Sequence, residues 1–149
     1  MPVESFEVNH FLNENSFPKM TEGRAEAGRM ENLVWSCISC NRGKYDIMIQ
    51  DPYENILNVD SGNITKVFYR DEDFSIKVCD TYQEDKFIQN FYKKLRLGYE
   101  TRRLDYFGLQ LRGRYLREKD EEKKNQLGNA LNILIRKRNM MKMTSEIAT

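Results

Sequence analysis

The spacing of apolar residues changes near Cys79, and this change limits the folds that are open to the chain. Upstream, "SFEVNHFL" (5–12) alternates apolar and polar side chains and "NLVWSC" (32–37) is a short apolar run, and both patterns are typical of strands. Two β-rich runs flank the charged "RDED" and predict a hairpin within residues 64–78. Downstream, apolar residues recur every three or four positions, which predicts helices. The sequence therefore predicts an α+β fold: a small N-terminal module, a β-hairpin and a C-terminal helical region.

Two helical stretches are predicted after residue 80. The first follows Thr81, a candidate N-cap, with Glu84 three residues later as in a capping box. The second covers residues 99–143 and is expected to break within the charged "REKDEEKKN" (117–125). The apolar faces at helical spacing are expected to be core: Phe87, Ile88, Phe91 and Leu95; Leu104, Phe107, Leu111 and Tyr115; and Leu127, Leu131, Leu134 and Arg138.

Length and composition are those of a globular protein without a membrane span. We expect two parts, residues 1–60 and 61–149, that pack as one compact unit. No run of about eighteen apolar residues occurs, and the first residues do not resemble a signal peptide. Three cysteines, an odd number, do not suit a secreted disulfide scaffold. We therefore expect a reducing, cytoplasmic setting.

Charge is distributed unevenly along the chain. Residues 1–60 carry five Lys+Arg and ten Asp+Glu, a net of −5, whereas residues 61–149 carry nineteen and thirteen, a net of +6; the two sum to +1. The basic half is either an ordinary solvated helical surface or a surface that contacts phosphate. Four arginines within "TRRLDYFGLQLRGRYLR" (101–117) line one broad face that binds nucleic acid, or else pair with nearby carboxylates: Arg103, Arg112, Arg114 and Arg117.

Cys37 and Cys40 form a C-x-x-C pair, a spacing found in zinc sites and in redox motifs. A closed zinc site needs two further ligands, and the only other soft candidates are Cys79 and His10. A further interpretation of the pair is two half-buried thiols without a metal. His10, the single histidine, stands near the end of a predicted strand, where an imidazole is either a structural residue or a general base.

Read together, "FEVNHFLNENSFP" (6–18) and "ENLVWSCISCNRGKYD" (31–46) resemble the HNH endonucleases, in the branch with a C-x-x-C-N-x-x-K-x-D signature. The helical C-terminal half is similar in style to members associated with retrons and defence systems. The resemblance implies a ββα-metal module, in which a two-stranded hairpin and a helix hold a divalent metal such as Mg²⁺. It also implies DNA as the partner and substrate.

The resemblance assigns roles to individual residues. His10 would be the general base, Asn32 would orient it, and Asn41 would complete an H-N-N variant of the motif. Asn9 and Asn41 would face the metal. Three further residues match the end of the signature: Arg42 and Lys44, at the start of the helix, would hold phosphate oxygens, and Asp46 would be structural or a weak ligand.

The chain departs from the family at three points. Asn9 stands where an acidic residue is usual, and Asn41 stands where a metal-binding His is common, so both amides bring no charge to the ion. The upstream C-x-x-C is also missing, because no cysteine precedes His10. Cys37 and Cys40 are then a vacant pair or half of a zinc shared by a homodimer. Either the upstream pair was lost or the chain starts inside the ancestral domain.

Three functions remain open at this point. The first is a metal-dependent endonuclease that hydrolyses phosphodiester bonds of DNA. The second is a catalytically degenerate HNH-like protein that binds nucleic acid or a protein partner, which the two amides and the missing cysteines favour. The third is a helical interaction module, which leaves the spacing of His10, Asn32 and Asn41 without an explanation.

Overall fold

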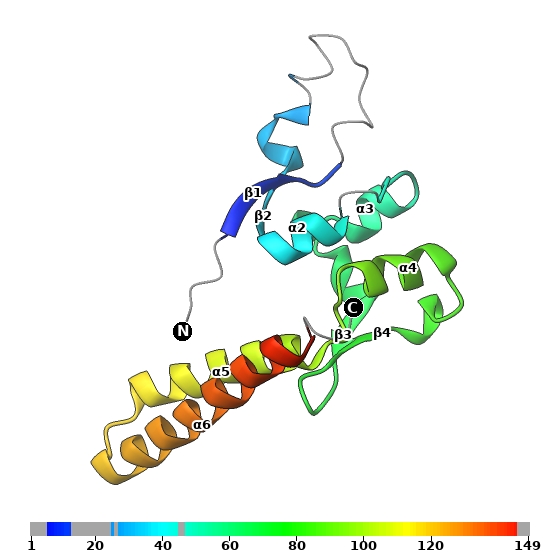
Figure 1. Cartoon of the computed structure of the whole chain (residues 1–149). Coiled ribbons are helices and arrows are strands. Elements are labelled where there is room, and N and C mark those ends of the chain that lie inside the picture. The colour runs from blue at the N-terminus through cyan, green and yellow to red at the C-terminus, as the bar shows by residue number, and fades with distance from the viewer. Residues whose placement is uncertain (1–5, 13–24, 26, 45–46, 146–149) are drawn as a thin grey trace. The chain divides into compact units, whose positions relative to one another are not determined.

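A computed structural model describes residues 6–12, 25, 27–44 and 47–145, without the side chains of residues 6–10, 34–35, 37–40 and 142–145 (Figure 1). The chain forms two compact units. The N-terminal unit runs to residue 69 and includes residues 77–97; the helical unit contains residues 70–76 and the chain from residue 98. The division therefore does not fall at residue 60, because residues 61–69 and 77–97 belong with the N-terminal unit. The α+β class is confirmed.

The N-terminal unit begins with an antiparallel pair of strands followed at once by a helix (Figure 1). β1 (Phe6–His10) pairs with β2 (Leu33–Cys37) in a register that sets Phe6 opposite Cys37 and His10 opposite Leu33. The 3₁₀ turn η2 (Met30–Asn32) leads into β2, and α2 (Ile38–Lys44) follows it without a linker. The two strands predicted from apolar pattern are confirmed.

The rest of the N-terminal unit supplies a core of apolar side chains. Among the most buried are Ile49, Leu57, Val67 and Ile88, each with at most 1% of its surface exposed. The elements that carry this core follow in chain order: α3 (Tyr53–Leu57), the 3₁₀ turns η3 (Val59–Ser61) and η4 (Asn63–Lys66), β3 (Phe68–Arg70), β4 (Ile76–Val78), η5 (Asp80–Tyr82) and α4 (Lys86–Lys94).

α4 begins later than predicted, because a different residue caps it. Asp85 is the N-cap: its Oδ1 accepts hydrogen bonds from Phe87 N at 2.9 Å and Ile88 N at 3.0 Å. Thr81 instead lies in η5, so the predicted capping box from Thr81 to Glu84 is wrong. The Asp85 carboxylate also accepts a hydrogen bond from Tyr53 Oη, at 2.9 Å, and so connects α3 to the start of α4.

α2 is held against α4 at very short range. A Cβ added at Gly43 would overlap the carbonyl oxygen of Lys94 and would lie 3.3 Å from its carbonyl carbon. Only a residue without a side chain fits here, because the obstacle is backbone that cannot rotate away. Gly43 therefore fixes the distance between α2, which carries several motif residues, and the helix that supports it.

The predicted hairpin is confirmed as β3 and β4, which form a two-stranded sheet. Its turn is closed by Asp71, whose Oδ1 accepts hydrogen bonds from Asp73 N at 3.1 Å and Ser75 N at 2.9 Å. Phe74 adopts a left-handed backbone conformation with φ of 67°. Its ring stacks on Phe107 of α5, with centroids 5.7 Å apart. An aromatic contact thus fastens the turn within the helical unit.

The helical unit is an antiparallel pair, α5 (Glu100–Arg117) and α6 (Glu121–Ser145), joined by three residues (Figure 1). Two glycines allow the helices to approach: a Cβ on Gly108 would lie 3.3 Å from Leu134, and one on Gly128 would lie 3.4 Å from Tyr115. Asp120 starts α6, its Oδ1 accepting a hydrogen bond from Lys123 N at 3.1 Å. The break predicted in residues 117–125 is confirmed. Of the helices in the described part of the chain, none has the length and apolar character needed to cross a membrane.

Candidate functional site

The three residues of the suspected motif lie on consecutive elements of the N-terminal unit. His10 is the last residue of β1, Asn32 directly precedes β2, and Asn41 lies in α2. The side chains of His10 and Asn9 lie outside the described part of the structure. The backbone nevertheless brings the ends of β1 and η2 together, because Phe11 N donates a hydrogen bond to Asn32 O at 2.6 Å.

Asn32 is a buried amide whose oxygen and nitrogen are both used. Its exposed fraction is 7%. Oδ1 accepts a hydrogen bond from Leu12 N at 2.6 Å, and Nδ2 donates to Leu12 O at 3.2 Å and to Ala27 O at 2.9 Å. Only an amide offers an acceptor and two donors in this arrangement. Asn32 therefore joins the backbone of Leu12, two residues after His10, to that of Ala27.

The motif residues of α2 differ in their exposure. Asn41 is half-buried and its side chain or backbone takes part in a further interaction. Arg42 is exposed, as a residue that contacts a phosphate needs to be. Asp46, the closing acidic residue of the signature, lies outside the described residues.

Lys44 does not lie on the surface. It is 9% exposed, and its ammonium stands 5.8 Å from the centroid of the Phe11 ring, which is itself buried. It is also the last residue of α2, not part of the first turn as expected. Burial lowers the pKa of Lys44 from 10.5 to about 8. This environment favours a packing role beside the residue that follows His10 over a contact with bulk phosphate.

Burial of Lys44 predicts a pH-dependent cost in stability. Because its folded pKa lies below the unfolded value, the penalty is complete below pH 8 and declines as the pH rises toward 10.5. We expect Lys44→Met, which keeps the length of the side chain, to raise the free energy of unfolding by about 2–3 kcal/mol at pH 7. Urea unfolding at pH 7 and pH 10 measures the difference, which is expected to shrink at the higher pH.

Lys86→Met is the matched control for this experiment, because Lys86 is an exposed lysine at the start of α4. It is expected to change the free energy of unfolding by no more than about 0.5 kcal/mol. A destabilising effect of Lys44→Met at pH 7 would show that the contact with Phe11 outweighs the cost of burial.

The cysteine pair spans the junction of strand and helix. Cys37 ends β2 and Cys40 lies in α2, and both side chains are outside the described part. Cys79, the third thiol, is free and half-buried. Among the side chains that the structure describes, no group of three or more His, Cys, Asp or Glu comes together to hold a metal. Both readings of the pair, vacant thiols or a zinc shared between two copies, stay predictions.

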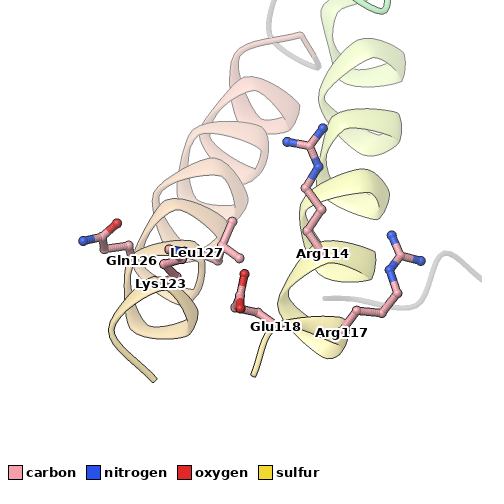
Figure 2. A pocket seen from close by; sticks show the side chains of 6 residues that line it. All are labelled: Arg114, Arg117, Glu118, Lys123, Gln126 and Leu127. Carbon is pink, nitrogen blue, oxygen red and sulfur yellow. The ribbon is translucent and has the colours of Figure 1, made fainter. Parts of the chain in front are cut away.

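The four arginines predicted to contact nucleic acid separate into two kinds. Arg103 forms a bidentate ion pair with Glu100, one turn earlier in α5, and these hydrogen bonds hold the pKa of Glu100 below its usual range. Arg112 is exposed. Arg114 and Arg117 are also exposed and line an open groove between α5 and α6 (Figure 2).

The sequence analysis missed the side of this groove that α6 provides. Lys123 and Gln126 line it together with Leu127 (Figure 2). Leu127 was recognised as part of an apolar stripe, and the residues one and four positions before it flank that stripe on a helix. This periodicity could have identified Gln126 and Lys123 as neighbours of the apolar stripe that packs on another helix. It could not have identified that helix as α5.

Comparison of the chain with protein-family models, with curated proteins and with solved structures finds no match.

Proposed function

We propose that the chain is a metal-dependent endonuclease of the HNH type that hydrolyses phosphodiester bonds of DNA. The observation that carries this proposal is the environment of Asn32. It lies between two antiparallel strands that are followed by a helix, and its buried amide holds the backbone just after His10. A backbone held in this way directly after His10 would limit the orientations open to the imidazole, as a general base requires.

In this proposal His10 is the general base. Its neutral imidazole takes a proton from the water that attacks phosphorus, a task that suits a pKa near neutrality. Asn32 is a positioning residue, since it contacts Leu12 and Ala27 and not the substrate. Arg42, exposed on α2, is available to bind a phosphate oxygen next to the scissile bond.

The donors of the proposed cation site fit a hard divalent ion in kind. Asn41 is a half-buried amide on α2, and Asn9 precedes His10 in β1, so both would offer carbonyl oxygens of the type that Mg²⁺ accepts. When bound, the ion would polarise the scissile phosphate and stabilise the leaving oxygen. Because neither amide carries a charge, we expect the chain to bind the ion weakly without DNA.

A plasmid-nicking assay with Mg²⁺ or Mn²⁺ tests the proposal. We expect His10→Ala to reduce the rate by about 10²–10⁴-fold, the usual contribution of a general base. Glu7→Gln, three residues earlier in the same strand, is the matched control and is expected to cut at the wild-type rate. Circular dichroism and urea unfolding of all three proteins establish that differences in rate do not reflect unfolding.

Wild-type protein that is folded and loaded with metal but does not cut DNA or RNA would overturn the nuclease proposal. Salt-sensitive DNA binding by such a protein would then indicate the degenerate, binding-only member of the family. Equal rates for wild type and His10→Ala would remove His10 from the reaction, whatever the enzyme cuts.

A further inference from the structure

The groove between α5 and α6 has a volume of about 550 Å³ and is open to solvent. Figure 2 shows the side chains that line it. It lies near the turn that joins the two helices, entirely within the helical unit. We call it the α5–α6 groove. Its lining residues are Arg114, Arg117 and Glu118 from α5 and the residue after it, and Lys123, Gln126 and Leu127 from α6.

The α5–α6 groove carries an excess of positive charge. Arg114 and Arg117 contribute two cations from one helix and Lys123 contributes a third from the other, against the single carboxylate of Glu118. That carboxylate is already engaged, because its Oε1 accepts hydrogen bonds from Lys119 N at 2.9 Å and Asp120 N at 3.0 Å.

The three cations of the groove also differ from other buried or paired arginines of the same helices. Arg103 is paired with Glu100, and Arg138 is paired with Asp105. Among the residues that the structure describes, no carboxylate forms an ion pair with Arg114, Arg117 or Lys123. Figure 2 shows that the side chain of Arg117 is directed away from α6, and its guanidinium lies 3.6 Å from where a Cβ on Gly113 would stand. Cations without carboxylate partners around this end of the helix pair create a local positive potential that attracts anions.

We propose that the α5–α6 groove binds the phosphodiester backbone of DNA, as a second contact in addition to the proposed HNH site. The choice of DNA as the anion rests on the proposed function. The positive charge of the groove is independent of that proposal. Arg114 and Arg117 are one helical turn apart in α5, and their side chains diverge, with Arg117 directed away from α6 (Figure 2). Donors spread in this way can contact successive phosphates of an extended backbone that crosses this end of the helix pair.

The shape and lining of the groove favour the backbone over bases or a small anion. An open groove lets a long ligand pass through, whereas a small anion is usually enclosed by its site. No aromatic side chain is among the lining residues, so the groove offers no surface on which a base would stack. Guanidinium and ammonium groups contact phosphate without reading sequence. Binding at the groove is therefore expected to be independent of DNA sequence and sensitive to salt.

Fluorescence anisotropy with the full chain and a labelled DNA duplex tests this inference. EDTA is present, so that the proposed metal site contributes as little as possible. The triple variant Arg114→Gln, Arg117→Gln and Lys123→Gln is compared with wild type over a range of salt concentrations. Each lost phosphate contact reduces the slope of log K against log salt by about 0.9, so the triple variant is expected to lose about 2.7. At low salt, its affinity is expected to be weaker by on the order of 100-fold.

Arg112→Gln is the matched control, because Arg112 is an exposed arginine of the same helix that does not line the groove. It is expected to reduce affinity by less than 3-fold. The inference is overturned if wild-type protein does not bind DNA, if the folded triple variant binds like wild type, or if Arg112→Gln alone weakens binding as strongly as the triple variant. Tighter binding of polyglutamate than of DNA would also overturn it, by assigning the groove to an acidic protein.

His10→Ala separates this inference from the proposed function. The variant is expected to bind DNA with wild-type affinity in EDTA while losing cleavage. The wild-type protein could bind DNA through the groove and yet not cut it. That result would support DNA binding by the groove and contradict the proposed nuclease activity.

Discussion

Asn32→Asp is expected to lower the free energy of unfolding by about 4 kcal/mol at pH 7. The oxygen of Asn32 accepts one hydrogen bond, but its nitrogen donates two, to the carbonyl oxygens of Leu12 and Ala27. A carboxylate would face both carbonyls in a site that is only 7% exposed. The carboxyl group would take up a proton and so avoid the repulsion from the two carbonyl oxygens. Protonation at pH 7, about three units above the ordinary pKa of an aspartate, costs about 4 kcal/mol.

Asn32→Ala is expected to cost less, about 2–3 kcal/mol, since it leaves polar backbone groups without partners but introduces no charge. Asn58→Asp is the control: Asn58 Oδ1 only accepts a hydrogen bond, from Asp60 N at 2.9 Å in an exposed position. A carboxylate can make the same bond, so the change is expected to stay within about 0.5 kcal/mol.

Urea unfolding of the Asn32 and Asn58 variants at pH 7 and pH 4 measures these differences. The cost of Asn32→Asp is expected to shrink at pH 4, where the protonated carboxyl is no longer penalised. Equal stabilities of Asn32→Asp and the wild type at pH 7 would mean that the amide does not hold the backbone of Leu12 and Ala27 in place. The role of Asn32 as a positioning residue would then have no physical basis.

Asp105→Ala is expected to destabilise the helical unit by about 3 kcal/mol, more than Arg138→Met, for which about 1–2 kcal/mol is expected. The two side chains form a bidentate pair, with Arg138 Nε to Asp105 Oδ1 at 2.7 Å and Nη2 to Oδ2 at 3.2 Å. The side chain of Arg138 is 10% exposed and that of Asp105 is 33% exposed. Asp105→Ala leaves the buried positive charge of Arg138 in place. Arg138→Met leaves the negative charge of Asp105, which water can reach.

Met at position 138 also keeps most of the apolar stem that packs between the helices. Glu100→Gln is the matched control, because it removes a carboxylate from a pair in the same helix whose arginine, Arg103, is 26% exposed, against 10% for Arg138. It is expected to cost no more than about 0.5 kcal/mol. Urea unfolding gives all three values, and a cost of Arg138→Met that exceeds that of Asp105→Ala would contradict the argument from exposure.

Local patterns in the sequence predicted most of the elements. Alternation identified β1, the apolar run identified β2, and the charged "RDED" identified the hairpin turn. The start of α4 was predicted wrongly, because Thr81 and Asp85 are both good caps and Thr81 has the added Glu84. Asp85 has a further partner that lies far away in the sequence, since it accepts a hydrogen bond from Tyr53.

The candidate site shows the same limit. The order and spacing of His10, Asn32 and Asn41 predict that these residues belong to one site, and this stays a prediction because the side chain of His10 lies outside the described part of the structure. The partners of Asn32 were not predictable, since a buried amide has no local signal that names the carbonyls it reaches. For the same reason, the burial of Lys44 beside Phe11 was not expected from a helix with mixed composition.

The sequence by itself determined the local secondary structure. Strands form where apolar residues alternate, helices form where apolar residues recur every turn, and the long helical stretch breaks where charges cluster. These are properties of neighbours along the backbone, and the covalent chain carries them. The tertiary structure alone decided which charges are neutralised. Arg103, Arg138, Arg114 and Arg117 read alike in the sequence, but two of them lie beside a carboxylate and two line an open groove. Whether a charge is paired depends on distances across helices and turns, which no single stretch of sequence contains.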